Sequence, residues 1–393
     1  ALVPVVGTGL VIAAGMTERA SEGGLLALAP MQLLGRYSYS VYLWHWPVLV
    51  LVAARHPDVL ADWPRALTVM LVAGLPAAVL SYHLVENPFR RSFTRRPDRK
   101  VLLAGAGILV GGAVFLAAYG PVAMGPLSSE KRAAAPAAGL KPTSFVPANL
   151  RPTLLAAHNG GNEAGRSCTR SLNPCFLGDP SATTTIALYG DSHSLHLFGA
   201  FDAAGRANHW KVIALVRPGC PSYEHPAAVK FLSCAGFRTS ALGFIRQADP
   251  DLVVLSNSST IALDQLGARM SYGVRRAVQS LPADVPVVVF GQTPTAARDV
   301  PACLSDHLHR TRACEPKPGS GRVAAVNRQL RAALARTRAN FVDVRRLVCE
   351  RRCPAVIGNV LVYRDDDHVT YDFARTRGPV LADILRPWIR NGA

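Results

Sequence analysis

The sequence predicts a membrane-spanning α-helical part followed by an α/β domain with a parallel sheet covered by helices. Three observations support this fold class. Long apolar runs without charge are confined to the first 120 residues, strand-like and helix-like segments alternate from about residue 167, and all eight Cys lie between Cys168 and Cys353. Only 18% of the residues are charged, against about 25% in an average soluble domain. We therefore expect part of the chain to lie outside water.

The apolar runs predict membrane spans at 2–14, 41–54, 66–85 and 101–119. The last two have the length of about 20 residues that a helix needs to cross a hydrocarbon core of roughly 30 Å. The first is short, and we interpret it as the end of a span that begins upstream. A large soluble core is the alternative interpretation. Between residues 87 and 100 lie six basic residues and one acidic residue, so the positive-inside rule predicts a cytoplasmic loop there and an external location after 119.

These observations predict four segments. Residues 1–100 form the end of a multi-span membrane domain, 101–120 an additional transmembrane helix, 121–165 a linker, and 166–393 an extracytoplasmic domain. The linker prediction depends on six Pro and few large apolar side chains between residues 121 and 165. Such a composition is too poor in apolar groups to fold alone.

The last segment alternates strands and helices. The predicted strands are 185–189, 211–216, 251–255, 286–290 and 340–344, and the predicted helices are 195–208, 237–248, 270–281, 322–339 and 371–389. This alternation is typical of a parallel sheet with helices on both faces. Ligands of such sheets bind at the carboxyl ends of the strands, so the residues that follow each strand are candidates for a site.

A serine and a histidine with a nearby aspartate stand out as candidate catalytic residues. Ser192 lies in the run GDSHS at 190–194, directly after the first strand. We expect it at the start of a helix, where backbone N–H groups favour negative charge on a nucleophilic oxygen. Asp365 and His368 are three residues apart near the C-terminus. That spacing lets the carboxylate orient the imidazole while His368 takes the Ser192 proton.

Two residues after later strands complete the predicted site. Gly219 follows the second strand and Asn257 the third, and a backbone N–H and a side-chain amide are the donors that an oxyanion needs. Each motif also has a simpler interpretation. The run 190–192 is a common turn and helix cap, and the acidic run 365–367 is compatible with a calcium site or a solvated loop.

The cysteines predict disulfide bonds in an oxidising compartment. Eight cysteines allow 105 pairings, and the short spacings favour neighbours: Cys168 with Cys175, Cys220 with Cys234, Cys303 with Cys314, and Cys349 with Cys353. A metal site is the alternative, although the cysteines lack the spacing of zinc ligands. His193 and His196 share a helical face and are a second candidate metal pair, but no further ligand is spaced to join them.

The motifs resemble two known families. The runs GDSHS at 190–194 and DDDH at 365–368 are similar to the SGNH (GDSL-type) hydrolase superfamily. The runs GRYSYSVYLWHWP at 35–47 and VENPFR at 85–90 resemble the acyltransferase-3 family of bacterial membrane O-acyltransferases. Fused proteins of this kind carry both parts in this order, joined by an extra helix and a linker. We expect the C-terminal portion of such a protein, with a three-layer SGNH-like outer domain.

The resemblance implies an O-acyltransferase that acetylates hydroxyls of a cell-envelope glycan. It implies that Ser192 is the nucleophile, His368 the base and Asp365 its orienting carboxylate, and that Gly219 and Asn257 match the oxyanion donors by position. The resemblance also implies that the acyl donor is acetyl-CoA, used through the membrane domain, and we expect the outer domain to bind no cofactor or metal. At most the last three spans of the family's membrane domain and the extra helix are expected here. We therefore expect this chain to retain ester chemistry without completing transfer across the membrane.

Two other functions stay open. A glycan acetylesterase would use the same residues with water as the acceptor, and a non-catalytic glycan-binding module would use neither. A net charge of +17 also suits nucleic acid, but the predicted compartment does not. The expected partners are therefore a glycan acceptor and the lipid bilayer, without nucleic acid. The predicted location is the bacterial inner membrane, with multiple spans and a periplasmic or extracellular outer domain.

Overall fold

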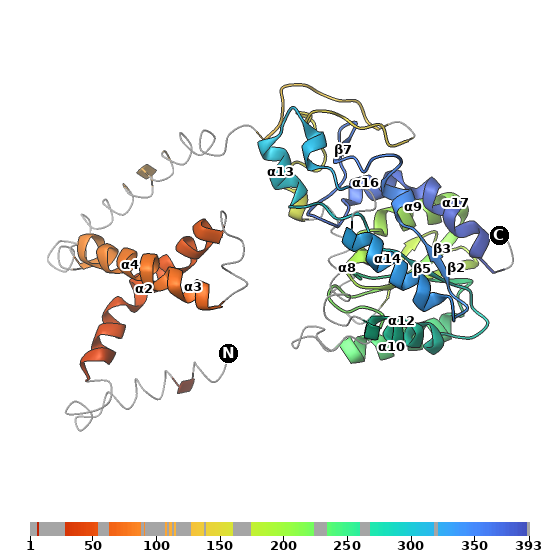
Figure 1. Cartoon of the computed structure of the whole chain (residues 1–393), viewed down its shortest axis with the longest axis horizontal. Coiled ribbons are helices and arrows are strands. Elements are labelled where there is room, and N and C mark those ends of the chain that lie inside the picture. The colour runs from red at the N-terminus through yellow and green to blue at the C-terminus, as the bar shows by residue number, and fades with distance from the viewer. Residues whose placement is uncertain are drawn as a thin grey trace. The chain divides into compact units, whose positions relative to one another are not determined.

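The computed structural model divides the chain into two compact units, Ala1–Gly120 and Pro121–Ala393. The structure describes residues 6–7, 28–53, 63–87, 90, 107, 110–111, 114, 127–136, 139–159, 174–223, 234–259, 268–317 and 321–390. The described residues of the first unit are almost all helical, and those of the second unit form a sheet with helices around it (Figure 1).

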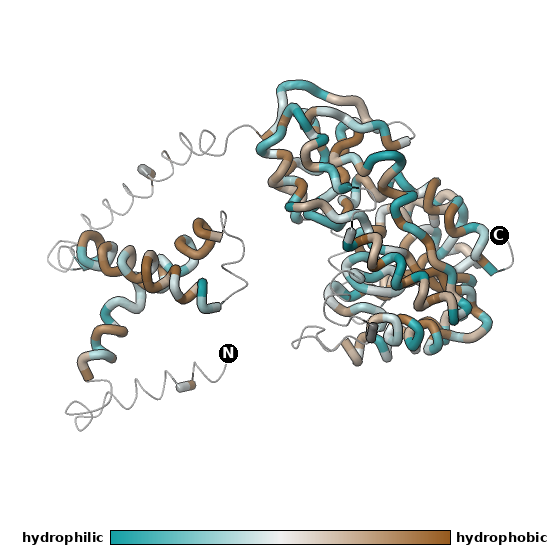
Figure 2. Tube along the Cα trace, viewed as in Figure 1, coloured by the Kyte–Doolittle hydropathy of each residue, from teal (hydrophilic) through white to brown (hydrophobic). Residues whose placement is uncertain are grey.

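One helix of the first unit is long and apolar enough to cross a membrane. It runs over Trp63–Glu86 and consists of α3 (Trp63–Val69), η4 (Met70–Gly74), α4 (Leu75–Ser81) and η5 (Tyr82–Glu86). Much of it is strongly apolar (Figure 2), and side chains such as Leu71, Val72 and Leu84 are exposed. The predicted span at 66–85 lies within this helix, and exposed apolar side chains of this kind are expected where a helix faces lipid.

The other predicted spans differ from this one. The predicted span at 41–54 falls in α2 (Ala29–Ala53), a 25-residue helix. Among the described helices only Trp63–Glu86 has both the length and the apolar content of a span, so the membrane span at 41–54 stays a prediction. Gln32, Arg36 and Ser38 in its first half lower its apolar content. The predicted spans at 2–14 and 101–119 lie almost wholly outside the described residues.

Polar contacts join α2 to the end of the apolar helix. Ser40 is buried, and its Oγ donates to Glu86 Oε2 at 2.7 Å. The hydroxyl of Tyr37 lies at hydrogen-bond distance, 2.9 Å, from His83 Nε2. The two sequence motifs at 35–47 and 85–90 therefore meet in the folded unit, although 46 residues separate Ser40 from Glu86.

The second unit contains a six-stranded, mostly parallel sheet with the order β1-β3-β2-β4-β5-β6. Its strands are β1 (Cys175–Gly178), β2 (Thr184–Gly190), β3 (Trp210–Val216), β4 (Leu252–Ser256), β5 (Val287–Phe290) and β6 (Asn340–Val342). The five predicted strands are β2 to β6, and all of them pair in parallel. The unpredicted β1 pairs antiparallel with β3 at the edge of the sheet.

Helices cover both faces of this sheet and give the predicted three layers. Along β2, Ile186 and Leu188 face one core, while Ala187 and Tyr189 face the other, because successive side chains of a strand point in opposite directions. The first core is completed by α9 (Phe198–Asn208), α16 (Tyr371–Thr376) and α17 (Gly378–Leu385). The second is completed by α10 (Cys234–Ala248), α12 (Ala268–Ser280) and α14 (Gly321–Leu334). Figure 1 shows α9, α16 and α17 together, away from α10 and α12.

The remaining elements are short and were not predicted. They are η6 (Ala157–Asn159), α13 (Val300–Asp306), η7 (Thr311–Cys314), α15 (Arg345–Val348), β7 (Val356–Ile357) and β8 (Val360–Leu361), whereas η8 (Arg386–Trp388) lies within the predicted helix 371–389. Elements of two to seven residues are too short to show a periodic apolar pattern. The predicted helix at 371–389 is divided into α16, α17 and η8, with α17 beginning at Gly378 and carrying Pro379 in its first turn.

The segment predicted as a linker is packed into the second unit where it is described. Five of its apolar side chains are buried in the first core: Leu140, Val146, Leu150, Leu154 and Ala157. Its backbone is bonded as well, since Val146 N–H donates to Leu308 O at 2.7 Å and Arg151 N–H donates to Asn359 O at 2.8 Å. The linker prediction is therefore wrong for 127–136 and 139–159. A segment too poor in apolar groups to fold alone can still fold against an existing core.

Three disulfide bonds join neighbouring cysteines, as the spacings favoured: Cys220–Cys234, Cys303–Cys314 and Cys349–Cys353. Cys175 is also disulfide-bonded. Its predicted partner, Cys168, lies outside the described residues. The disulfides close short loops, and each fixes one loop against a neighbouring element.

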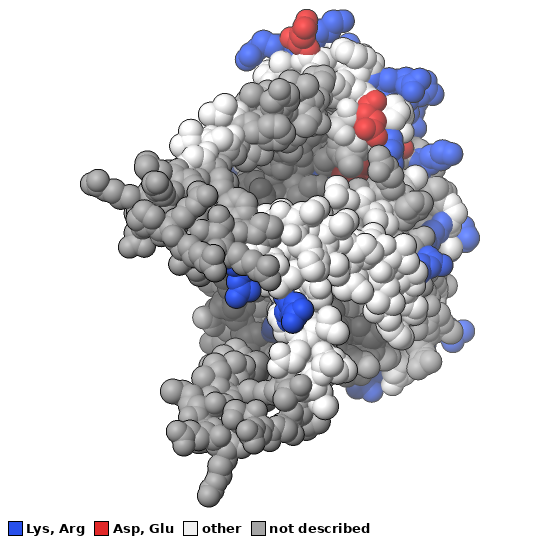
Figure 3. Space-filling model, turned by 90° about the vertical axis from the view of Figure 1, so that its left-hand side faces the viewer, with Lys and Arg blue, Asp and Glu red and all other residues white. Residues whose placement is uncertain are grey.

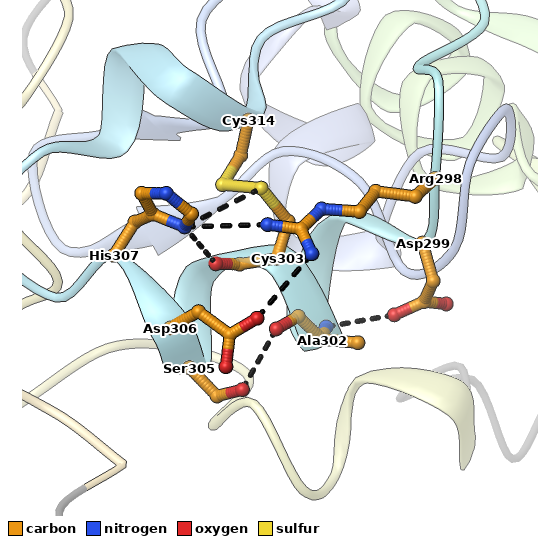
Figure 4. The surroundings of a disulfide bond; sticks show 8 residues. All are labelled: Arg298, Asp299, Ala302, Cys303, Ser305, Asp306, His307 and Cys314. Atoms are coloured by element: carbon orange, nitrogen blue, oxygen red, sulfur yellow. Dashed lines mark hydrogen bonds and ion pairs between the residues drawn. A yellow bond between two sulfur atoms is a disulfide. The ribbon is translucent and has the colours of Figure 1, made fainter. Parts of the chain in front are cut away.

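The Cys303–Cys314 disulfide joins α13 to η7 (Figure 4). His307 points toward the sulfur atoms, and its Nδ1 is 2.9 Å from Cys303 O. At the start of the same segment, Ala296 N–H donates to Asp366 O at 2.8 Å, and Val300 N–H donates to Asp365 O at 3.4 Å. The disulfide-bonded segment therefore supports the backbone of the acidic run.

Basic side chains are distributed over the surface. On the face drawn in Figure 3, Lys and Arg side chains stand in separate places among uncharged residues, and acidic side chains are few. Residues 121–393 carry a net charge of +13.

Adjacent leucines test whether the 139–159 segment belongs to the folded unit. Leu154 is 5% exposed and Leu155 is 63% exposed. We expect Leu154→Ala to lower the free energy of unfolding by about 2–5 kcal/mol through lost burial and a residual cavity. The matched change Leu155→Ala should stay within about 0.5 kcal/mol of the wild type. Thermal unfolding of the full chain in detergent micelles, followed by near-ultraviolet circular dichroism, measures both. Equal effects of the two changes would show that the segment is not packed.

Candidate active site

The candidate site lies where the order of the parallel strands reverses. From β2 the chain crosses to β3 on one side, and then returns to β4 on the other side of β2. Crevices for ligands form at the carboxyl ends of the strands at such a switch point. Ser192 follows β2 and Asn257 follows β4, so both lie at this edge of the sheet.

Asp191 ties the start of the serine helix to the neighbouring strand. It is the N-cap of α8 (Ser192–Leu195), and its Oδ1 accepts from the backbone N–H of His193 at 2.9 Å. Its other carboxylate oxygen accepts from Ser258 N–H, after β4, at 2.9 Å. Burial raises the pKa of Asp191. The Asp of the GDSHS run therefore positions the serine and does not touch the imidazole of His368 in the described contacts.

Close packing before the serine requires glycine. A Cβ placed on Gly190 would collide with the carbonyl oxygen of Ser256. Ser194 Oγ donates to that same carbonyl at 2.8 Å, and Ser256 Oγ donates to His193 O at 3.1 Å. Helix α8 is one turn long, so its dipole is a smaller source of positive potential than the sequence analysis expected.

The three predicted catalytic residues converge. Ser192 Oγ and His368 Nε2 are 2.8 Å apart, although 176 residues separate them in the chain. His368 Nδ1 is 2.8 Å from Asp365 Oδ2, and the backbone N–H of His368 donates to Asp365 Oδ1 at 2.7 Å. In the neutral ring, with Nδ1 donating to the carboxylate, Nε2 accepts a hydrogen bond from the Ser192 hydroxyl. This is the hydrogen-bond order of a nucleophile, a base and an orienting acid.

The loop that carries the imidazole is held on several sides. Tyr363 and Val369 form an isolated β-bridge, and Arg364 N–H donates to His368 O at 2.9 Å. Val369 N–H also donates to His196 Nδ1 at 3.3 Å. Burial lowers the pKa of His196, with the charges of His193 and His368 as further causes, so this ring is a neutral acceptor. The sequence analysis did not predict this role of His196. The signal that could have indicated it is the position of His196 four residues after Ser192.

A second carboxylate faces the same imidazole. Asp367 Oδ1 is 3.0 Å from His368 Nδ1, and Asp367 Oδ2 is 3.4 Å from His193 Nε2. Burial alone lowers the pKa of His368, but the hydrogen bonding and charge of Asp365 and Asp367 outweigh it and raise the pKa to about 9. Hydrogen bonding and charge from His193 and His368 lower the pKa of Asp367, although its burial acts in the opposite direction. Sequence reasoning did not assign a role to Asp367.

The two predicted oxyanion donors have different surroundings. Gly219 has a φ of 76°, which suits the third position of a type II turn after Pro218, and it is exposed. Asn257 is buried, its Oδ1 accepts from Ser222 N–H at 2.9 Å, and its Nδ2 donates to Ser222 Oγ at 3.0 Å. In the described contacts, the Asn257 Nδ2 donates one hydrogen bond, to Ser222 Oγ. Their role as oxyanion donors stays a prediction.

The alternative metal interpretations find little support in the described residues. The Cys303 and Cys314 sulfur atoms near His307 form a disulfide bond and are not free thiolates. In the acidic run, the carboxylates of Asp365 and Asp367 face an imidazole. Ligand atoms of His193, Asp367 and His368 lie within 4.8 Å of one another, and the ion-pair contacts of Asp367 with both rings account for that proximity.

This arrangement defines an SGNH-type domain, in which a serine hydroxyl and an imidazole meet at the carboxyl edge of a parallel sheet. The chain belongs to the family of SGNH domains fused to AT3 domains, because the model of that family matches residues 158–383.

Two curated relatives align with shorter stretches. The chain is 42% identical over 79 residues to the "Putative peptidoglycan O-acetyltransferase YrhL" of Bacillus subtilis (strain 168), covering 19% of this chain and 12% of that protein. It is 28% identical over 90 residues to the "O-acetyltransferase OatA" of Staphylococcus aureus (strain MRSA252), covering 22% of this chain and 15% of that protein. The chain therefore aligns with only a small part of each relative.

A solved structure with a similar fold is the periplasmic domain of a lipopolysaccharide acetyltransferase from Salmonella ser. Paratyphi A. It has a TM-score of 0.42 and 14% sequence identity, with 58% of this chain and 93% of that chain covered. A carbohydrate acetylesterase family member from Sinorhizobium meliloti has a TM-score of 0.34 and 14% identity, with 52% of this chain and 99% of that chain covered.

Removal of the Asp191 carboxylate tests its structural role. We expect Asp191→Ala to destabilise the fold by about 1–3 kcal/mol for each of the two N–H groups left without an acceptor. As a control, Asp306→Ala removes a carboxylate whose one described side-chain contact is an exposed ion pair with Arg298, and should cost at most about 1 kcal/mol. Thermal unfolding of the full chain measures both changes. An Asp191→Ala protein as stable as the control variant would contradict the role assigned to this carboxylate.

Proposed function

We propose that this chain is part of a membrane-bound O-acetyltransferase whose outer domain transfers an acetyl group to a hydroxyl of a cell-envelope glycan. One observation carries the proposal. A continuous hydrogen-bond chain runs from Ser192 through His368 to Asp365, with both side-chain distances at 2.8 Å. In this proposal Ser192 is the nucleophile, His368 the base and Asp365 the carboxylate that orients it.

The first half of the proposed reaction forms an acetyl-enzyme. Ser192 Oγ bonds to the carbonyl carbon of the acetyl donor while His368 Nε2 takes the hydroxyl proton. Asp365 stabilises the imidazolium that results. The bond from the acetyl carbon to the leaving group then breaks, and His368 returns the proton to that group.

The oxyanion of this step needs hydrogen-bond donors. The Ser192 N–H is at the first position of α8, where a helix supplies no internal acceptor. We propose that this N–H acts with Gly219 and Asn257. Each well-placed donor of this kind contributes on the order of 3–4 kcal/mol to the transition state.

The second half transfers the acetyl group. A glycan hydroxyl gives its proton to His368 and bonds to the acetyl carbon, and the ester bond to Ser192 Oγ breaks as His368 returns the proton to that oxygen. The fusion with AT3 domains that defines the family and the acetyltransferase names of both curated relatives favour a glycan over water as the acceptor. A glycan acetylesterase, with water as the acceptor, is the second candidate.

We also propose a location for each part. Residues 1–100 belong to the membrane domain, 101–120 to an additional span, and the outer domain lies in the periplasm or outside the cell with the described residues 127–136 and 139–159 as part of it. The helix Trp63–Glu86 supports contact with the bilayer, and three disulfide bonds support an oxidising compartment. In this arrangement the acetyl group comes from acetyl-CoA through the membrane domain.

Product partition separates transfer from hydrolysis. The full chain in detergent micelles is supplied with an activated acetyl ester and a cell-envelope oligosaccharide, and acetylated sugar and free acetate are both quantified. We expect acetylated sugar from the wild type. Ser192→Ala should lower both products by a factor of at least about 1,000, because no acyl-enzyme forms. Free acetate alone would favour the esterase, and an active Ser192→Ala chain would overturn the proposal.

The rate of Ser192 acylation should rise with pH and level off above about pH 9. With the pKa of His368 raised to about 9, the imidazole is protonated below that pH and cannot accept the Ser192 proton. Each pH unit below the midpoint therefore lowers the rate about tenfold. Labelling of the full chain by a fluorescent organophosphonate measures this rate. A labelled Ser192 whose rate does not change between about pH 6 and pH 10 would be inconsistent with His368 as the base.

A further inference from the structure

We infer that Asp367 and His193 form a positioning pair that sets how tightly His368 holds its proton. This inference rests on the proposed function, because it gives a role to groups that do not touch the reacting atoms. Asp367 contacts Nδ1 of the imidazole, whereas Ser192 contacts Nε2. No sequence motif assigned to catalysis includes either residue in this role.

The carboxylate of Asp367 lies between two imidazoles. One oxygen is 3.0 Å from His368 Nδ1 and the other is 3.4 Å from His193 Nε2. The same Nδ1 is 2.8 Å from Asp365. Two carboxylates therefore compete for one N–H, and one of them has a second imidazole as an alternative partner.

His193 is fixed in place as that alternative partner. It is 2% exposed, its N–H donates to Asp191 Oδ1, and its carbonyl accepts from Ser256 Oγ. Its ring centroid is 4.7 Å from that of His368. Among the described residues, its buried Nε2 has no hydrogen-bond partner. An unpaired buried polar atom is costly, so a movement of Asp367 toward His193 gains a hydrogen bond there and loses the contact with His368.

The position of Asp367 therefore changes how readily His368 releases its proton. While its carboxylate contacts His368, two negative charges stabilise the imidazolium. When it moves to His193, only Asp365 stabilises the imidazolium, and His368 releases its proton more readily. The other titratable or charged groups near His368 are His196 at the end of α8, Asp191 at its start, and Arg364 and Asp366 on the loop of His368 itself. None of these side chains contacts Asp367 in the described ion pairs and hydrogen bonds.

Substitutions on the two sides of the carboxylate should move the pH midpoint of Ser192 labelling in opposite directions. Asp367→Asn removes a negative charge beside His368, so the midpoint should fall by about one pH unit or more. At pH 7 the fraction of molecules with a free base then rises about tenfold. His193→Phe removes the competing partner, so Asp367 stays on His368 and the midpoint should rise. His193→Gln keeps a donor for Asp367 and should return the midpoint toward the wild-type value.

The control is the neighbouring carboxylate. Asp366 is exposed, and its side chain has no described hydrogen bond or ion pair with either imidazole. Asp366→Asn removes the same charge from the same loop and should move the midpoint by less than Asp367→Asn does, because the Asp366 side chain acts on His368 only through its charge, without a direct contact. In the double variant Asp367→Asn/His193→Phe, the upward shift from His193→Phe should disappear, since its cause requires Asp367.

The experiment follows organophosphonate labelling of the full chain in detergent micelles across the pH range, with thermal unfolding as a check on folding. Where Asp367→Asn fails to fold, Asp367→Ser and His193→Phe carry the same test. An unchanged midpoint in folded Asp367 variants, or an upward shift that persists in the double variant, overturns the positioning pair while Ser192 labelling leaves the proposed function intact. A wild-type chain that shows no labelling of Ser192 at any pH overturns both.

Discussion

The hydrogen bond between Ser192 and His368 is the interaction on which the candidate site depends. It joins two segments that are 176 residues apart, and neither segment brings the other to it through local structure. The serine is placed by the end of β2, by close packing at Gly190 and by the Asp191 cap. The imidazole is placed by its loop, which is bonded to His196 and to the disulfide-linked segment that begins near Ala296. Ser192 and His368 are each held by contacts of their own segment, so neither side chain depends on the other for its position.

Charge is concentrated around this bond in a way that favours the protonated base. Asp365 and Asp367 both face His368 Nδ1, whereas a single carboxylate is sufficient to orient an imidazole. The second carboxylate adds stability to the imidazolium, which helps during acyl transfer but holds the resting base in its protonated form. A partner that draws Asp367 away relieves this conflict, and His193 is the imidazole within reach of it.

The second unit includes residues 139–159 in addition to the sheet and its covering helices. The described residues between 139 and 159 add apolar side chains to the same core as α9 and α17, and their backbone bonds to the loops around β7 and β8. These loops lead directly into the segment that carries Asp365 and His368. The packing of residues 139–159 is therefore linked to the position of the base through short, buried contacts.

Local patterns in the sequence were sufficient to predict many of the secondary-structure elements of this protein. The five parallel strands, their helices and the run Trp63–Glu86 each show in a few consecutive residues, because burial on a strand or in lipid demands apolar side chains without interruption. The roles proposed for Ser192, Asp365 and His368 could be predicted because their order after particular elements carries information about which edge of the sheet they reach.

Other features depend on contacts between distant residues, and only the tertiary structure decided them. The apolar residues of the 139–159 segment follow no helix or strand period, and they pack against a core made from the rest of the domain. Because α8 and the 363–369 loop pack together, His196 accepts a hydrogen bond from the Val369 N–H. The fold of the same loop places Asp367 as a second carboxylate next to the His368 imidazole. Sequence by itself determined which groups were available. Their distances, and so which of them share a proton, were decided by packing between segments that the chain order leaves far apart.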